Sequence, residues 1–213
     1  MRNLAKPIRI PRGYLSWSQL WLWEHDKEEY KRHYFQGLKK YEDNPKMKFG
    51  KSFAESRERN ESCEDPLAEL ARIFTPSMPT KEVEIIAWLI LDNQIKVKLL
   101  GKPDGFDRKS LTLVEDKTGR NWTQRMVDTH GQITFYALII WLETSKLLKR
   151  IFLNFIPTQV DEDGKVSVCG KARTFQTKRE LSDLFLMVNR ISKAVKEINK
   201  EYEKYLKSLK KKK

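Results

Sequence analysis

The stretch of residues 82–117 restricts the possible folds most, because it contains three short strands in succession. Residues 82–91 form an apolar run, residues 95–102 alternate apolar side chains with lysines, and residues 111–117 form a second apolar strand pattern. Turn-forming residues separate each strand from the next. Strands joined by such short turns pair as antiparallel neighbours, so the sequence predicts a meander.

Helical patterns surround these strands. The helix predicted over residues 127–144 leads into an apolar strand at 151–156, and a strand reached through a helix is typical of a parallel crossover. A short returning strand is predicted at 166–168. Further helices are expected over residues 14–36, from about residue 49, over 67–74, and from residue 177 onward. We therefore predict an α/β fold in which a central mixed β-sheet is flanked by helices, with helical additions at both ends.

The first and last helices each leave two interpretations open. The first begins at a Ser16–Gln19 capping box and is rich in aromatic residues, which either pack the helix onto the domain or form a platform for stacking bases. The last begins at a Thr177–Glu180 capping box, and its apolar residues from Leu181 to Tyr205 recur at intervals of three and four. This seam either packs against the sheet or joins the chain to another subunit or a protein partner.

The charge of the chain favours a polyanionic partner. The 213 residues carry a formal net charge of +13, and nucleic acid is the simplest partner for such a charge. A chain of this length is expected to form one domain, and its 39% hydrophobic residues are enough for a core. We expect this domain over residues 14–203, between a basic arm (1–13) and a lysine-rich tail (204–213). Two cysteines are too few for a disulfide scaffold or an iron–sulfur cluster. With no leader-like start and no apolar run of membrane-spanning length, we expect a cytoplasmic protein without a membrane partner.

The strand over residues 111–117 ends in charged side chains that share one face. Alternation places Glu115 and Lys117 on the same face as the leucines before them. Such groups are costly to bury without a function, and functional sites gather at strand ends. Pro103 interrupts the preceding strand, and the following turn folds Asp104 back toward Glu115. Two neighbouring carboxylates repel unless a cation lies between them, and hard oxygen ligands favour Mg²⁺ or Mn²⁺.

Four motifs follow one another along residues 14–156. Residues 14–20 read Tyr-Leu-Ser-Trp-Ser-Gln-Leu, residues 101–104 read Gly-Lys-Pro-Asp, residues 114–119 read Val-Glu-Asp-Lys-Thr-Gly, and residues 132–136 read Gln-Ile-Thr-Phe-Tyr. In the same order, these motifs resemble the Ser-x-Ser-x-Leu, Gly-x-x-Asp, Asp/Glu-x-Lys-Thr-Gly and Gln-x-x-x-Tyr motifs of the PD-(D/E)xK nuclease superfamily, in its RecB-type and phage nuclease branch. The resemblance implies a restriction-endonuclease-like core.

The resemblance also implies roles for the charged residues of the central strands. Asp104 and Glu115 would coordinate magnesium, or manganese, with the backbone carbonyl of Asp116 as a further ligand. Lys117 would orient the attacking water and offset the charge that builds on the phosphate. The implied activity is metal-dependent hydrolysis of phosphodiester bonds in DNA.

Two further site elements follow from the resemblance. Gln132 and Tyr136 lie one helical turn apart and are expected to hold the site or the DNA backbone near it. The alternative is that Tyr136 belongs to the core and Gln132 is an ordinary polar neighbour. Many relatives place a histidine four residues after a glycine, whereas Gly50 is followed at that spacing by Ala54; the adjacent Glu55 is the expected extra acidic ligand. Iron–sulfur relatives carry a cysteine in the first helix, which this chain lacks, so no such cluster is expected.

The loop that follows the charged strand is the expected contact with nucleic acid. Thr118, Arg120, Trp122 and Arg125 offer hydrogen-bond donors, positive charge and an aromatic ring to phosphates and bases. The single histidine that follows, His130, is expected to be structural. We predict a magnesium-dependent deoxyribonuclease, in particular an exonuclease of phage or bacterial DNA recombination and repair. The rival hypotheses are a non-catalytic nucleic-acid-binding protein that keeps the fold, and a structural subunit that recruits a partner through its last helix.

Overall fold

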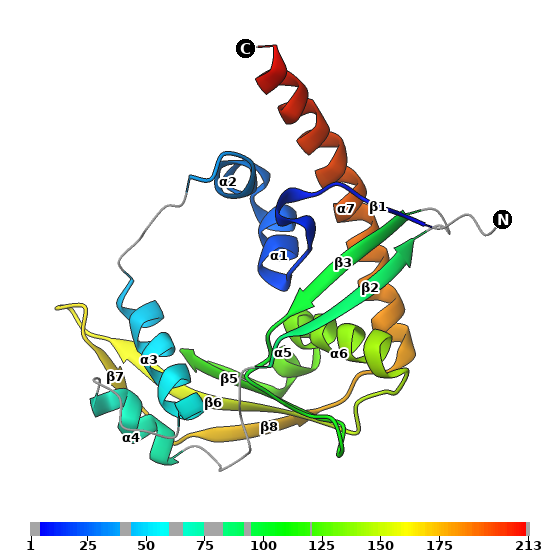
Figure 1. Ribbon diagram of the computed structural model, residues 1–213. Helices are drawn as coiled ribbons and strands as arrows, with labels where there is room; N and C mark the ends of the chain where they lie inside the picture. Colours follow the sequence, from blue (N-terminus) through cyan, green and yellow to red (C-terminus); the bar gives the residue numbers. More distant parts are fainter. Residues whose placement is uncertain are drawn as a thin grey trace.

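The structure of the chain is a computed structural model, shown in Figure 1. It describes the following residues: 5–38, 44–59, 66–74, 83–91, 95–119 and 121–211.

The strands form two sheets rather than one central sheet. The first has the order β1-β3-β2, with β3 antiparallel to β2 and parallel to β1. The second runs β4-β5-β6-β7, with β8 also paired to β6. The bounds are β1 (Lys6–Pro7), β2 (Ile85–Leu91), β3 (Ile95–Gly101), β4 (Gly105–Asp107), β5 (Thr112–Gly119), β6 (Arg150–Val160), β7 (Val166–Val168) and β8 (Arg173–Thr177).

The predicted hairpin of strands β2 and β3 is confirmed, whereas the predicted pairing of strand 95–102 with strand 111–117 is wrong, because the short strand β4, absent from the prediction, pairs with β5 instead. The pairs β2–β3 and β4–β5 are antiparallel, and β5 lies parallel to β6 after a helical crossover. The chain leaves the first sheet after Gly101 and enters the second at Gly105, so the predicted meander is divided between two mixed sheets. The division falls at Pro103, whose missing amide hydrogen prevents continued pairing. The α/β class with mixed sheets flanked by helices is therefore confirmed.

The helices lie largely where their local signals predict them. The Ser16 hydroxyl caps the first helix by accepting from the Gln19 amide at 3.4 Å. Asp26 then interrupts the predicted single helix and caps a second one, because its carboxylate accepts from the Glu29 amide at 2.9 Å. The bounds are α1 (Trp17–His25), α2 (Lys27–Tyr30), a π-helical turn (Lys31–Phe35), α3 (Pro45–Arg59), α4 (Pro66–Phe74), α5 (Gln124–Asp128), α6 (Gly131–Thr144) and α7 (Leu181–Lys210).

Helix α6 is the centre of the larger core. It packs against β2 and β3 on one side and against α7 on the other. Figure 1 shows α7 as one long helix that passes α6 and projects beyond both sheets toward the C-terminus. Along the seam of α7, Leu184, Ile191, Val195 and Ile198 are buried in this core. The seam therefore packs on the domain itself, mainly against helices α6 and α1.

The predicted start of the last helix is wrong, and the structure adds detail to the basic arm and to the lysine-rich tail. Helix α7 begins at Leu181, with a capping box formed by Glu180 and Asp183, because Thr177 instead ends β8, a strand absent from the prediction. The basic arm is not merely extended, since Lys6 and Pro7 pair with β3. The lysine-rich tail is helical to Lys210.

Most of the aromatic residues of the first helices serve packing. Trp23 and Tyr30 are buried and meet edge to face, with ring centroids 5.1 Å apart. Trp21 is exposed and stacks on His25.

Candidate active site

The candidate site lies where the chain passes from the first sheet to the second. Asp104 follows Pro103 directly, and β4 begins one residue later with Gly105 paired to Val114 of β5. This register brings the Asp104 carboxylate beside β5, where its Oδ2 accepts a hydrogen bond from the Asp116 amide at 2.7 Å. The broken strand therefore places Asp104 at the polar end of β5, as the sequence predicts.

Glu115 and Lys117 share one face of β5 and contact each other. The Lys117 ammonium lies 2.6 Å from Oε1 of Glu115. The Glu115 side chain is only 3% exposed, whereas that of Lys117 is 24% exposed, so the cluster opens to solvent on the lysine side. The second carboxylate oxygen of Glu115, Oε2, is buried and accepts no hydrogen bond. A buried carboxylate oxygen without a donor costs free energy unless a cation or water satisfies it.

The electrostatics of the cluster reflect an excess of negative charge. Burial and the charge of Glu115 raise the pKa of Asp104 well above its ordinary value. Burial also raises the pKa of Glu115, and Lys117 only partly offsets this effect. Burial alone would lower the pKa of Lys117, but the carboxylates of Glu115 and Asp104 outweigh it and raise that pKa. The lysine is therefore an ammonium at neutral pH, and it balances one of two carboxylates.

The donor set fits a hard divalent cation. Two carboxylates face one ammonium, and Oε2 of Glu115 is an orphaned oxygen ligand in a buried position. The amide and the carbonyl of one extended residue project from the same edge of a strand, so the Asp116 carbonyl lies at the edge where Asp104 accepts the Asp116 amide. Within the described ranges, no group of three or more His, Cys, Asp or Glu side chains converges to hold a metal. The backbone carbonyl of Asp116 would add a third oxygen ligand to the carboxylates of Asp104 and Glu115.

The Asp116 side chain points to the opposite face of β5 and forms a second, buried network. Its Oδ2 pairs with Nε of Arg57 from α3 at 3.2 Å, and its Oδ1 accepts from the Asn154 amide of β6 at 2.8 Å. Asn154 in turn accepts from the Thr174 hydroxyl of β8 at 2.9 Å. Asp116 thus ties β5 to three elements from behind the site. The sequence gives one signal for this network: Asn154 is a polar residue inside an otherwise apolar strand. Arg57 has no such local signal.

Gln132 and Tyr136 brace the strand that leads to Asp104. The Gln132 amide donates to the Tyr136 hydroxyl at 2.8 Å, and that hydroxyl donates to the Lys102 carbonyl at 3.0 Å. Tyr136 is buried and packs against Gly101, where an added methyl group would lie 3.0 Å from the ring. The pair therefore positions the backbone two residues before Asp104. Both alternatives from the sequence meet here, because Tyr136 belongs to the core and also holds the site strand.

Similar solved structures share this arrangement of elements. No protein-family model matches the sequence, and no curated protein matches it significantly. A candidate exonuclease from Eubacterium rectale matches with a TM-score of 0.57 at 12% identity, over 89% of this chain and 82% of that one. A phage-related exonuclease from Haemophilus somnus 129PT matches with a TM-score of 0.51 at 12% identity, over 85% and 81%. An alkaline exonuclease from Laribacter hongkongensis matches with a TM-score of 0.51 at 13% identity, over 94% of both chains.

The chain has the fold of these exonucleases. The nuclease fold implied by the sequence motifs is thereby confirmed. Because the sequence identities are so low, the likeness establishes the fold alone, and the function depends on the residues of the site.

The remaining predicted site residues are Glu55, Thr118, Arg120, Trp122 and Arg125. Glu55 on α3 pairs with Lys51 at 3.7 Å and is not gathered with Asp104 and Glu115 into a described acidic group. Thr118 is half-buried and lies near Gly50 of α3. Trp122 is half-buried against the core, with its ring centroid 4.9 Å from that of His130, and Arg125 is exposed on α5. Arg120 lies outside the described residues.

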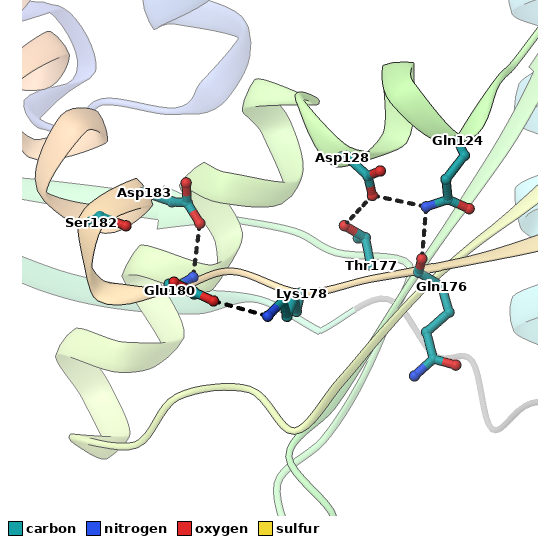
Figure 2. Close-up of a pocket in the computed structure, with 8 residues that line it drawn as sticks. All are labelled: Gln124, Asp128, Gln176, Thr177, Lys178, Glu180, Ser182 and Asp183. Carbon is teal, nitrogen blue, oxygen red and sulfur yellow. Dashed lines mark hydrogen bonds and ion pairs between the residues drawn. The ribbon is translucent and has the colours of Figure 1, made fainter.

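A hollow of about 630 Å³ lies away from the carboxylate cluster, between α5, β8 and the start of α7. Figure 2 shows that its polar side chains largely satisfy one another. Asp128 accepts from the Gln124 amide and from the Thr177 hydroxyl, each at 2.8 Å. None of the residues that line it belongs to the cluster of Asp104, Glu115 and Lys117. This hollow therefore belongs to the scaffold of β8 and α7.

None of the helices in the described part of the chain combines the length and the apolar character needed to span a bilayer.

Proposed function

We propose that this protein is a metal-dependent deoxyribonuclease that acts from DNA ends, as an exonuclease of phage or bacterial recombination and repair. The observation that carries the proposal is the cluster of Asp104, Glu115 and Lys117, in which the ammonium lies 2.6 Å from one carboxylate and a buried carboxylate oxygen has no donor. The names of the structures with the same fold support an exonuclease activity.

The residues of the cluster have separate roles in this proposal. Asp104 and Glu115 would hold Mg²⁺ or Mn²⁺, together with the backbone carbonyl of Asp116. The cation, when bound, supplies polarisation of the scissile phosphate and lowers the pKa of a coordinated water. Lys117 directs its ammonium into the same space, where it can donate a hydrogen bond to the attacking water and balance charge on the phosphate. Gln132 and Tyr136 keep the strand before Asp104 in place.

The test compares Lys117→Ala with the wild-type chain on end-labelled linear DNA and on closed circular DNA in Mg²⁺. We expect cleavage to fall by about 10²–10³-fold while DNA binding persists, since a preorganised charge at the reacting group is lost. Lys109→Ala is the matched control, because Lys109 is an exposed lysine in the hairpin between β4 and β5. Equal cleavage by Lys117→Ala would remove the catalytic proposal, and degradation of circular DNA would indicate an endonuclease.

Metal binding has a readout that is independent of cleavage. Titration of Mn²⁺ followed by calorimetry should show a site in the wild-type chain that Glu115→Gln weakens at least about tenfold, because one charged oxygen ligand is lost. Chelator should stop cleavage, and added Mg²⁺ should restore it. A chain that binds DNA but leaves every substrate intact with either metal would instead be the non-catalytic binding protein.

A further inference from the structure

The outer face of the β2–β3 hairpin carries an exposed apolar row on an edge strand. Ile86, Trp88 and Ile90 are 41%, 48% and 60% exposed, while the alternating residues of β2 are buried toward α6. Strand β2 is the last strand of its sheet in the described part of the chain. Exposed apolar side chains at alternate positions of one strand indicate a binding surface, because contact between such a row and water is unfavourable.

A row of lysines runs beside the apolar row. In the antiparallel register, Lys98 lies opposite Trp88, and Lys96 lies opposite Ile90. The Lys96 ammonium sits 4.9 Å from the centre of the Trp88 ring. Strand alternation puts Lys102 and Glu84 on this same face, where they pair at 3.3 Å. Among these residues, one carboxylate stands against three ammonium groups, so the face is positively charged.

We infer that this face binds single-stranded nucleic acid and leads it to the cluster at Asp104. The inference rests on the proposed nuclease function, because it names single-stranded DNA as the form of DNA that reaches the site. Bases have apolar faces that stack on an aromatic ring, and a positive groove tracks the phosphates. Lysines two residues apart on one strand are about 6.7 Å apart, which suits successive phosphates of an extended strand. The apolar row thus receives bases, and the lysine row receives the backbone.

The position of the face relative to the site supports this occupant. Strand β3 carries both Lys96 and Lys98 and continues through Lys102 to Asp104. The six residues from Lys98 to Asp104 span at most about 20 Å, which is a few nucleotides of a single strand. The face and the carboxylates are therefore joined by one short stretch of chain.

A second copy of the chain fits this face less well. Two hairpins packed face to face would bring the lysine rows of both copies together, and the whole chain carries a net charge of +13. Like charges in such proximity oppose association. A polyanion relieves this repulsion, so charge complementarity favours nucleic acid over self-association.

The experiment measures anisotropy of a labelled 15-nucleotide oligothymidylate with the full chain in chelator, so that no cleavage occurs. Trp88→Ala should weaken binding by about five- to a hundredfold, the effect of one lost stacking contact, and Trp88→Phe should recover most of it. Trp21→Ala is the matched control, because Trp21 is equally exposed but lies on α1. A blunt duplex of the same length should respond less than twofold to all three.

Salt dependence tests the lysine row separately. Lys98→Gln should reduce the slope of log K against log salt by about 0.7 for the single strand, the effect of one lost phosphate contact, and Trp88→Ala should leave that slope unchanged. The inference would be overturned if Trp88→Ala and Lys98→Gln both bound the oligonucleotide as tightly as the wild type. It would also be overturned if sedimentation showed a dimer that requires Trp88 and binds the oligonucleotide no better than the monomer does. These outcomes are distinct from a failure of the proposed function, which would appear as unchanged cleavage by Lys117→Ala.

Discussion

The ion pair between Arg57 and Asp116 allows the sharpest test of how the site is held. Both side chains are nearly inaccessible, at 8% and 5% exposure, and Nε lies 3.2 Å from Oδ2. Replacing Arg57 by Met keeps a long apolar stem but strands the Asp116 carboxylate with Asn154 as its remaining side-chain donor. Removing one partner of a buried pair costs about 3–5 kcal/mol, and we expect Arg57→Met to lose that much unfolding free energy.

The measurement is urea unfolding at pH 7 in chelator, followed by circular dichroism. Arg108→Met is the matched control, because Arg108 pairs with Glu143 at only 2.6 Å but its side chain is 55% exposed. A solvent-exposed ion pair contributes less than about 1 kcal/mol, so the unfolding free energy of Arg108→Met should stay close to that of the wild type, although the lost ion pair is the shorter one. The double variant Arg57→Met/Asp116→Asn should recover about 2 kcal/mol, because it removes the stranded charge and keeps an acceptor for Asn154.

Two results would contradict this reasoning. A loss below about 1 kcal/mol for Arg57→Met would mean that the Asp116 carboxylate is solvated or protonated at little cost. A double variant less stable than Arg57→Met would mean that the Asp116 carboxylate is not a cost once Arg57 is gone, because the two variants differ only in that charge. Either result would remove the network as the support of β5.

Two further perturbations probe the surroundings of the cluster. Gly101→Ala should cost about 1–3 kcal/mol in urea unfolding, because its methyl group would lie 3.0 Å from the Tyr136 ring. Gly50→Ala should be neutral or stabilising, because its methyl group would make only an ordinary contact of 3.6 Å with the Thr118 hydroxyl. Burial, with the charge of Lys117, lowers the pKa of His130 to about 4. The unfolded chain therefore binds a proton near pH 6.5, whereas the folded chain does not bind it until about pH 4. Between pH 7 and pH 5 the unfolding free energy of the wild type should fall by about 1 kcal/mol relative to that of His130→Phe, after allowance for solvent screening. An equal difference between the two proteins at both pH values would refute this shift.

The parts of the fold that follow from local signals could be predicted. Apolar runs located β2 and β5, the period-two pattern located β3, and the Ser16–Gln19 capping box located the start of α1. The convergence of Asp104 with Glu115 was predictable for the same reason, since a short hairpin and a proline determine it. Such signals are contained within about ten residues of the chain, so no knowledge of distant contacts is needed.

The parts that depend on distant partners could not be predicted. Strand β8 is short and largely exposed, it pairs with β6, and its sequence shows no apolar alternation. Arg57 meets Asp116 across 59 residues of sequence, and nothing near Arg57 indicates that its charge will be buried. Glu55, two residues before Arg57, pairs with Lys51 at the helix surface, and its role as a metal ligand stays a prediction. One side of α3 thus faces β5, and spacing along the chain did not reveal which side.

The triplet Glu115-Asp116-Lys117 combines two functions because a strand alternates its faces. Glu115 and Lys117 form the cluster on one face of β5, and Asp116 is held on the opposite face by α3 and β6. The Asp116 side chain is held by Arg57 and Asn154, and a rotation of β5 that broke these contacts would move Glu115 and Lys117 together relative to Asp104. The residue between the two proposed catalytic positions is therefore a positioning residue. This network accounts for the Asn154 amide within β6, and through Arg57 it gives α3 a contact with the strand that carries the site.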